Sequence, residues 1–192
     1  AGVDMLALIK EHDLPSKFPE EVVIEAKSKG DTIEKSKIKN RVDLRDRHIF
    51  TIDGEDAKDL DDAVRVIKID NNTYLLDVHI ADVSYYVTQD SLLDKEALFR
   101  GTSIYMLGRV IPMLPRELSN GICSLNAKED RFTLSVSMKI DSKGNVIDSN
   151  VYKAVIRVTE RMNYSDVQKI IDKSDKVVLK KYEKYIKDFE LM

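Results

Sequence analysis

A dense run of carboxylates between two apolar runs is the feature that most constrains how this chain can fold. The segment IDGEDAKDLDD, from Ile52 to Asp62, carries six carboxylates and one lysine. It follows the run IFTI and precedes the run AVRVIKI. Apolar, β-branched runs favour strands, and a polar segment between two of them favours a surface loop. The sequence therefore predicts a strand, an acidic loop and a second strand.

The acidic loop is electrostatically costly, because two carboxylates about 4 Å apart repel by about 1 kcal/mol even in water. Such a cluster persists if its side chains point into solvent or if a cation sits among them. Hard oxygen ligands favour Mg²⁺, Mn²⁺ or Ca²⁺. A calcium EF-hand is excluded, because counting from Asp53 puts Lys58 at the glycine position and Val64 at the glutamate position. A solvated acidic loop and a magnesium-type site both remain open from spacing alone.

The remaining strand patterns predict an α+β fold, with a mixed, largely antiparallel sheet and flanking helices. Candidate strands are His48–Ile52, Ala63–Ile69, Tyr74–Ala81, Arg131–Ile140 and Val146–Val158. Within Arg131–Ile140, apolar residues alternate with polar ones. This alternation predicts a half-buried strand with Phe132 and Leu134 on the buried face and Thr133 and Ser135 on the other.

Helices are predicted at both ends of the chain and in its middle. The expected helices are Val3–Glu11, a segment from Pro19 to about Ala26, Leu92–Arg100, Arg116–Asn120 and one that ends at Asp172. For the last of these, Ser165 and Gln168 match a capping box. A later apolar stripe at helical spacing, from Val178 to Phe189, has no obvious partner, so the chain is expected to be part of something longer.

Composition narrows the class of protein. The chain has 192 residues, 43% of them hydrophobic, which is enough for a core. A single cysteine excludes a disulfide framework and a cysteine zinc site. With no secretory signal and no apolar run of membrane-spanning length, a cytoplasmic location is expected. The net charge of -3 leaves a nucleic-acid partner open, and residues 27–47 carry eight basic and four acidic side chains.

Several motifs in order resemble the catalytic (RNB) domain of the ribonuclease II and ribonuclease R superfamily. The matching segments are RVDLRDRHIFTIDGEDAKDLDDAVRV (41–66), HIADVSYYV (79–87) and GTSIYMLGRVIPMLPRELSNGICSLN (101–126). Residues 9–26 also resemble the linker before that domain. The resemblance implies that residues 1–40 end the preceding region and that residues 41–192 form the N-terminal portion of the catalytic domain.

What the resemblance implies is Mg²⁺-dependent, processive 3′-to-5′ hydrolysis of single-stranded RNA to nucleoside 5′-monophosphates, with Mn²⁺ as a possible substitute. Asp61 matches the catalytic aspartate of the family, and Asp53, Asp59 and Asp62 match its metal site. Tyr105 matches an aromatic residue that stacks on a base near the RNA 3′ end, where a ring face grips any base. The expected partner is an RNA 3′ end, with no DNA, no membrane and a monomeric protein.

For the other candidate residues, no part in the chemistry is expected. Glu55 and Asp56 are expected to face solvent, and His79 and Cys123 to be structural. The family's domain continues beyond Met192 with a motif of the form HFTSPIRRY and with further active-site residues, so the isolated chain is expected to have little or no activity. Two alternatives remain: a non-catalytic RNA-binding module and an unrelated acidic metal-binding domain.

Overall fold

The computed structural model describes residues 2–106 and 108–192. Two compact units emerge from their contacts. The sheet unit comprises residues 32–82 and 123–192, and the helical unit comprises the described residues of 1–31 and 83–122. The acidic segment lies in the sheet unit, so that unit is described first.

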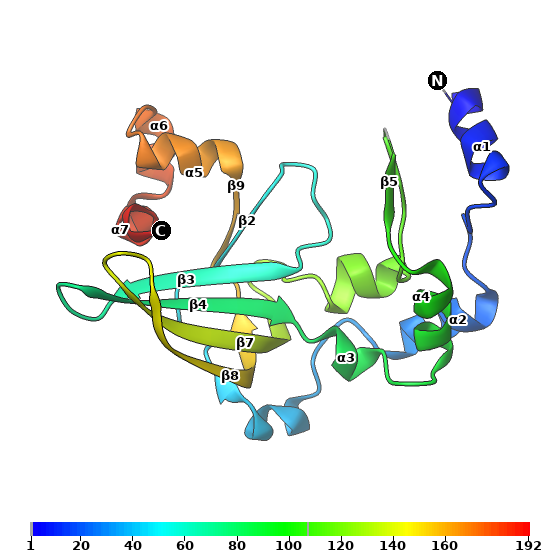
Figure 1. Cartoon of the computed structure of the whole chain (residues 1–192), viewed down its shortest axis with the longest axis horizontal. Coiled ribbons are helices and arrows are strands. Elements are labelled where there is room, and N and C mark those ends of the chain that lie inside the picture. The colour runs from blue at the N-terminus through cyan, green and yellow to red at the C-terminus, as the bar shows by residue number, and fades with distance from the viewer. Residues whose placement is uncertain (1, 107) are drawn as a thin grey trace. The chain divides into compact units, whose positions relative to one another are not determined.

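The sheet unit is built on seven strands (Figure 1). Their bounds are β1 Val42–Asp43, β2 Phe50–Asp53, β3 Asp62–Lys68, β4 Thr73–Ala81, β7 Asp130–Asp141, β8 Val146–Arg157 and β9 Glu160–Asn163. Their spatial order is β1-β8-β7-β4-β3-β2-β9. Only the pairs β1–β8 and β2–β9 are parallel. The expected α+β class with a largely antiparallel sheet is confirmed, and so is the β3–β4 hairpin.

Three helices after β9 cover part of the sheet near β2 (Figure 1). They are α5 Tyr164–Ile171, α6 Lys176–Lys181 and α7 Ile186–Leu191, with the short 3₁₀ helix η3 Glu183–Tyr185 between the last two; a further 3₁₀ helix, η1 Lys35–Asn40, precedes β1. The expectation that the C-terminal apolar stripe has no partner is wrong. Val178, Tyr182 and Phe189 are buried in one cluster with Phe50 and Met162.

The start of α5 also corrects the sequence analysis. The capping residue is Asn163, whose Oδ1 accepts a hydrogen bond of 2.7 Å from the backbone N–H of Asp166. Ser165 lies inside the helix. Asn163 ends strand β9, so the strand carries its own helix cap and the turn between the two elements is short.

Strand β7 buries only part of the face that its alternation predicts: Phe132 is 1% exposed, as expected, but residues of the opposite face are buried as well. Thr133 and Ser135 are fully buried, whereas Leu134 is 47% exposed. The buried hydroxyls satisfy one another at 2.9 Å, and Ser135 Oγ lies 2.8 Å from Nδ1 of the buried His79. A polar cluster whose members hydrogen-bond to one another can replace an apolar face in a core. The alternation therefore predicts the strand and the burial of Phe132 correctly, but it is wrong for Leu134 and for the hydroxyl-bearing face.

The helical unit contains the remaining elements. They are α1 Gly2–Glu11, α2 Glu20–Ser28, α3 Val83–Tyr86, α4 Leu92–Arg100, the hairpin strands β5 Ile104–Met106 and β6 Arg109–Ile111, and the irregular helix η2 Glu117–Ile122. Its core includes the buried Val22, Ala26 and Leu93, from α2 and α4. Arg100 joins α4 to the chain before α2 by donating to the carbonyl oxygens of Pro15 at 2.6 Å and Lys17 at 2.7 Å.

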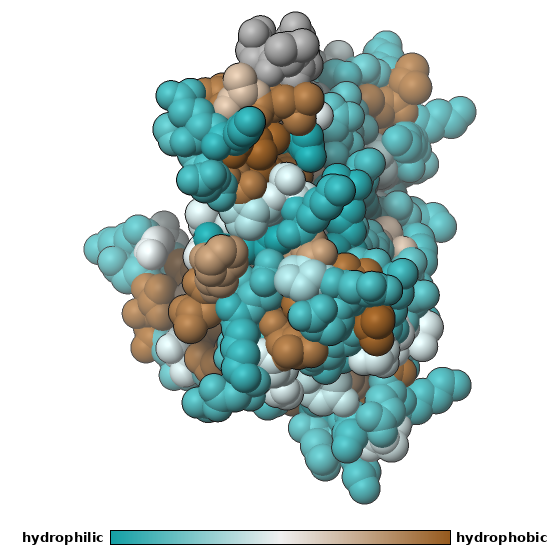
Figure 2. Space-filling view, turned by 90° about the vertical axis from the view of Figure 1, so that its right-hand side faces the viewer, coloured by the Kyte–Doolittle hydropathy of each residue, from teal (hydrophilic) through white to brown (hydrophobic). Residues whose placement is uncertain are grey.

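Among the described residues, no helix is long and apolar enough to cross a membrane. On the face that Figure 2 shows, hydrophilic residues cover much of the surface, and hydrophobic residues appear in separate patches.

Candidate functional site

The acidic loop, residues 54–61, joins two neighbouring antiparallel strands at one edge of the sheet (Figure 1, the cyan connection between β2 and β3). Strand β2 ends at Asp53 and β3 begins at Asp62. Phe50 pairs with Val64, so the end of β2 and the start of β3 lie at the same edge. The backbone of Asp61 is fixed as well, because its carbonyl oxygen accepts a 3.0 Å bond from Ala81 N–H. The fold therefore gathers carboxylates that are up to nine positions apart.

The downstream half of the loop, Lys58–Leu60, is anchored in the core. Leu60 is 1% exposed. Its N–H donates to Ser124 Oγ at 3.1 Å, and Ser124 Oγ donates to the carbonyl of Lys58 at 2.9 Å. The carbonyl of Leu60 accepts a 2.8 Å bond from Leu125 N–H. The segment that follows the helical unit therefore pins the backbone on both sides of Asp59.

The upstream half of the loop, Gly54–Ala57, is held by one side chain from β9. Nη2 of Arg161 lies 2.8 Å from the carbonyl oxygen of Glu55, 2.7 Å from that of Ala57 and 3.3 Å from that of Gly54. Within the loop, Ala57 N–H donates to Gly54 O at 3.2 Å. This half carries the exposed side chains of Glu55 and Asp56, as the sequence predicts.

The charges of the four predicted aspartates interact, as the pKa shifts of two of them indicate. The pKa of Asp53 is raised, first by burial and then by the charge of Asp62, with smaller contributions from Asp61 and Asp59; the Arg161 guanidinium acts in the opposite direction. Asp61 is an exposed residue, yet partial desolvation of its carboxyl group is the largest cause of its raised pKa, followed by the charges of Asp59 and Asp62. The ionised forms of Asp53 and Asp61 are therefore less stable here than those of isolated carboxyl groups.

The donor set fits a hard divalent cation. Oδ2 of Asp53 is buried with no hydrogen-bond partner, which is a costly state for a carboxylate oxygen. A cation ligated by this oxygen and by neighbouring carboxylates would remove that cost. In the described part of the chain, no group of three or more His, Cys, Asp or Glu side chains lies close enough together to hold a metal ion. Because like charges repel, carboxylates lie farther apart without a cation than around one.

Other predicted residues lie apart from this loop in the chain. Tyr105 is in β5, within the helical unit, and is 66% exposed. His79 is fully buried, and burial lowers its pKa to about 4. Cys123 is 3% exposed, and burial raises the pKa of its thiol to about 12. Both side chains lie in the core, as a structural role requires.

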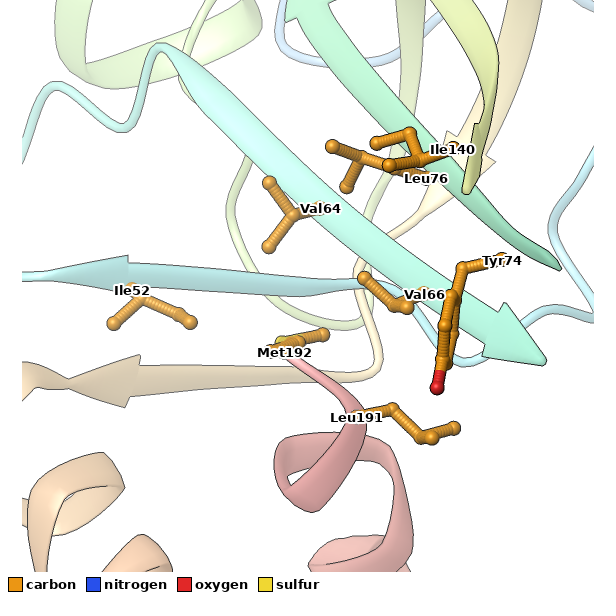
Figure 3. Close-up of a pocket in the computed structure, with 8 residues that line it drawn as sticks. All are labelled: Ile52, Val64, Val66, Tyr74, Leu76, Ile140, Leu191 and Met192. Atoms are coloured by element: carbon orange, nitrogen blue, oxygen red, sulfur yellow. The ribbon is translucent and has the colours of Figure 1, made fainter. Parts of the chain in front are cut away.

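An apolar pocket in the sheet unit is a poor alternative site (Figure 3). Its lining consists of Ile52, Val64, Val66, Tyr74, Leu76, Ile140, Leu191 and Met192. Figure 3 shows the side chains of strands β2, β3 and β4 facing the last residues of the chain. The lining offers one hydroxyl and no carboxylate, so it lacks the groups that hold a cation or a phosphate.

Two residues that organise the loop were missed by the sequence analysis. Ser124 and Arg161 follow the loop in the chain by about 60 and 100 positions. Arg161 reaches the loop because β9 pairs in parallel with β2, with Thr51 opposite Arg161 and Asp53 opposite Asn163. The motif GICSLN contains Ser124, but no local pattern pairs β9 with β2.

Comparison with known proteins identifies the family. The model of the RNB domain family matches residues 41–192. Ribonuclease R of Thermotoga maritima is 50% identical over 186 residues, which is 96% of this chain and 26% of that protein. Ribonuclease R 1 of Lactococcus lactis is 47% identical over 191 residues, which is 100% of this chain and 23% of that protein. The chain thus spans about a quarter of the length of these relatives.

Solved structures agree with the sequence comparisons. Mycoplasma genitalium RNase R in complex with double-stranded RNA has a TM-score of 0.84 and 30% identity, covering 91% of this chain and 31% of that one. The same enzyme with ribose-methylated single-stranded RNA also has a TM-score of 0.84, at 29% identity, covering 97% and 30%. Ribonuclease R proteins are therefore relatives in both sequence and structure, and the chain belongs to the RNB domain family.

Proposed function

We propose that the protein containing this chain is a Mg²⁺-dependent exoribonuclease that degrades single-stranded RNA processively from its 3′ end to nucleoside 5′-monophosphates. The observation that carries the proposal is the acidic loop of an RNB-family chain, where four aspartates interact electrostatically and one carboxylate oxygen is buried without a partner. RNA in the solved complexes of the Mycoplasma genitalium relative supports an RNA substrate.

Each aspartate of the loop has a proposed role that follows from its position. Asp53 ends β2, Asp62 begins the neighbouring β3, and both are the proposed principal metal ligands, with Asp59 supporting the same centre. Asp61 is the proposed catalytic residue, whose carboxylate accepts a hydrogen bond from the attacking water and orients it toward the phosphorus. Bound Mg²⁺, or Mn²⁺ in its place, would supply charge neutralisation at the scissile phosphate and make a water molecule more acidic.

Tyr105 is the proposed contact to the RNA base near the 3′ end. Its exposed ring, in the β5–β6 hairpin, offers a face on which any base can stack. Base–aromatic stacking is worth about 1–3 kcal/mol per base and tolerates every sequence. Such a contact suits an enzyme that must move along RNA without choosing among bases.

The wider expectations remain part of the proposal. The catalytic domain begins near residue 41, the residues before it end the preceding region, and the protein works as a cytoplasmic monomer on RNA rather than DNA. The 192-residue chain alone is proposed to have little or no activity, because it spans about a quarter of its relatives.

The proposal is tested by measuring release of mononucleotides from 3′-tailed single-stranded RNA with Mg²⁺. The proteins compared are the full-length gene product, its Asp61→Asn variant and an Asp148→Asn control, which changes an exposed aspartate of β8. The expected result is release by the wild type and the control, with a loss of at least about 100-fold in Asp61→Asn.

Equal activity of the wild type and Asp61→Asn would contradict the proposal for this loop. If the wild type and both variants bind RNA but none of them cleaves it, the result would support the non-catalytic binding module instead. Robust mononucleotide release by the 192-residue chain would contradict the expected inactivity of that chain.

A further inference from the structure

We propose that Arg161 is a positioning residue of the aspartate site: its guanidinium fixes the upstream half of the acidic loop, the backbone that leads from Asp53 to the anchored segment around Asp59. The inference rests on the proposed function, because it concerns how the same site is held in shape. It assigns a task to a side chain that lies outside the carboxylate cluster itself.

The first argument is the placement of Arg161 in the sheet. Thr51 pairs with Arg161 and Asp53 pairs with Asn163 in the parallel β2–β9 ladder. Side chains two positions apart in a strand share a face, so Arg161 lies on the same side of the sheet as Asp53. Phe50 and Met162 occupy the opposite face, in the core under α5 and α7. Packing of Met162 therefore fixes the backbone from which Arg161 reaches the loop.

The second argument is the number of acceptors that one nitrogen serves. Nη2 carries two hydrogens. The carbonyl oxygens of Glu55 and Ala57, at 2.8 and 2.7 Å, can take both, while Gly54 O at 3.3 Å shares them. Hydrogen bonds from an ionised donor are stronger than neutral ones. All three acceptors are backbone atoms, so the guanidinium restrains the path of the chain.

The third argument is that the restrained backbone connects two of the site's aspartates. The upstream half runs directly from Asp53 toward Asp59, and its acidic side chains, Glu55 and Asp56, are exposed. The downstream half is already held by Leu60 and Ser124. The restraint from Arg161 therefore falls on the half of the loop that lacks a buried anchor. A displacement of about 1 Å in a catalytic group can lower a rate about 100-fold.

The rival reading is that Arg161 binds an RNA phosphate. An arginine that served only the substrate would raise KM when replaced and would leave the loop unchanged. A positioning arginine lowers kcat, changes KM less, and loosens the loop even without RNA or metal. These outcomes separate the two roles.

The experiment compares the full-length gene product with its Arg161→Gln, Arg161→Lys and Arg157→Gln variants. Arg157 is a matched control, an exposed arginine of β8 whose Nε donates to Asp130 at 2.7 Å. Hydrogen–deuterium exchange of residues 54–58 is measured without metal, and kcat and KM for 3′-tailed RNA are measured with Mg²⁺. Arg161→Lys supplies the result if Arg161→Gln does not fold.

We expect faster exchange in the loop and a kcat lowered about 10- to 100-fold in Arg161→Gln. Arg161→Lys should fall between that variant and the wild type, because an ammonium keeps the charge but not the planar fork. Exchange and kcat in Arg161→Gln equal to those of Arg157→Gln would overturn the inference, as would a change in KM alone. An Asp61→Asn variant that keeps full activity would refute the proposed function, while the exchange result would still decide the role of Arg161 in holding the loop.

Discussion

The two halves of the acidic loop are held in opposite ways. The downstream half has a buried leucine, a buried serine hydroxyl and a backbone hydrogen bond from Leu125. The upstream half has exposed acidic side chains and the guanidinium of Arg161 at its carbonyls. One half is anchored in the core of the sheet unit, and the other is restrained at the surface.

This difference teaches how a cluster of like charges can be kept in a small space. Burial of Leu60 and Ser124 supplies the free energy that holds the backbone near Asp59. The exposed half can add little stability, because surface interactions are weak. It can still control geometry, since a restraint that is worth little in unfolding can decide where a carboxylate lies. We therefore expect one half of this eight-residue loop to matter mainly for stability and the other mainly for positioning.

Replacement of the buried leucine should have the largest effect on stability. Leu60→Ala removes a side chain that is 1% exposed and leaves a cavity at the loop anchor. We expect the free energy of unfolding of the 192-residue chain to fall by about 2–5 kcal/mol in urea. Ala substitution of the exposed Lys58 is the control. A loss below about 1 kcal/mol in Leu60→Ala would contradict the core-anchored description.

Removal of the serine hydroxyl should have the next largest effect. Ser124→Ala leaves the N–H of Leu60 buried without its acceptor and frees the carbonyl of Lys58. The expected loss is about 1–3 kcal/mol in the same urea experiment. The control is Ser142→Ala, in the exposed β7–β8 turn, which should change stability very little. Equal effects of the two substitutions would mean that Ser124 does not anchor the loop.

Replacement of Arg161 should cost less stability than either change downstream. Its hydrogen bonds are at an exposed site, so Arg161→Gln is expected to lower the free energy of unfolding by less than about 1 kcal/mol. Urea unfolding of Arg161→Gln and Ser124→Ala side by side measures the difference directly. If Arg161→Gln were the more destabilising of the two, the contrast between the halves would be wrong.

The smallest effect should be a gain in stability. The pKa of Asp61 is raised by partial desolvation and by its neighbours, so its ionised form is destabilised in the fold. Without metal, Asp61→Asn should therefore raise the free energy of unfolding at neutral pH by a few tenths of a kcal/mol, because exposed charges are screened.

The pH dependence of that gain has a definite sign. A carboxyl group whose folded-state pKa lies above its unfolded value binds its proton more tightly in the fold, so stability rises as pH falls through the folded-state pKa. The asparagine variant lacks this rise, and its advantage should shrink in acid. An advantage that grows as pH falls, measured by urea unfolding at several pH values, would contradict the raised pKa.

Local patterns were enough for the longer strands β3, β4, β7 and β8, for β2, and for the acidic loop between β2 and β3, but not for the short strands β1, β5, β6 and β9. The β3–β4 hairpin follows from two apolar runs around Asp70–Thr73, and the carboxylates follow from one short segment. Local patterns did not predict correctly which side chains of a strand are buried. Alternation in β7 suggested that Leu134 is buried, but the hydroxyls of Thr133 and Ser135 join His79 in a buried polar cluster. That cluster depends on a neighbouring strand.

The two residues that hold the acidic loop were not predicted, also because their role depends on distant parts of the chain. Arg161 and Ser124 act on the loop through strand pairing and backbone contacts between distant segments. Nothing in the residues next to them marks that task. The placement of the C-terminal stripe was misread for a related reason, since its partner Phe50 lies far earlier in the chain. Periodicity finds an apolar face but does not say what covers it.

The most direct test of the account is whether the loop aspartates hold one divalent cation site. Mn²⁺ binding to the full-length gene product is measured by electron paramagnetic resonance, with Asp53→Asn and the exposed control Asp148→Asn. We predict that Asp53→Asn weakens Mn²⁺ binding at least about tenfold, because it removes the charge of a carboxylate whose Oδ2 is buried without a partner, and that Asp148→Asn binds as the wild type does. Equal Mn²⁺ affinity in Asp53→Asn and the wild type would contradict the central claim.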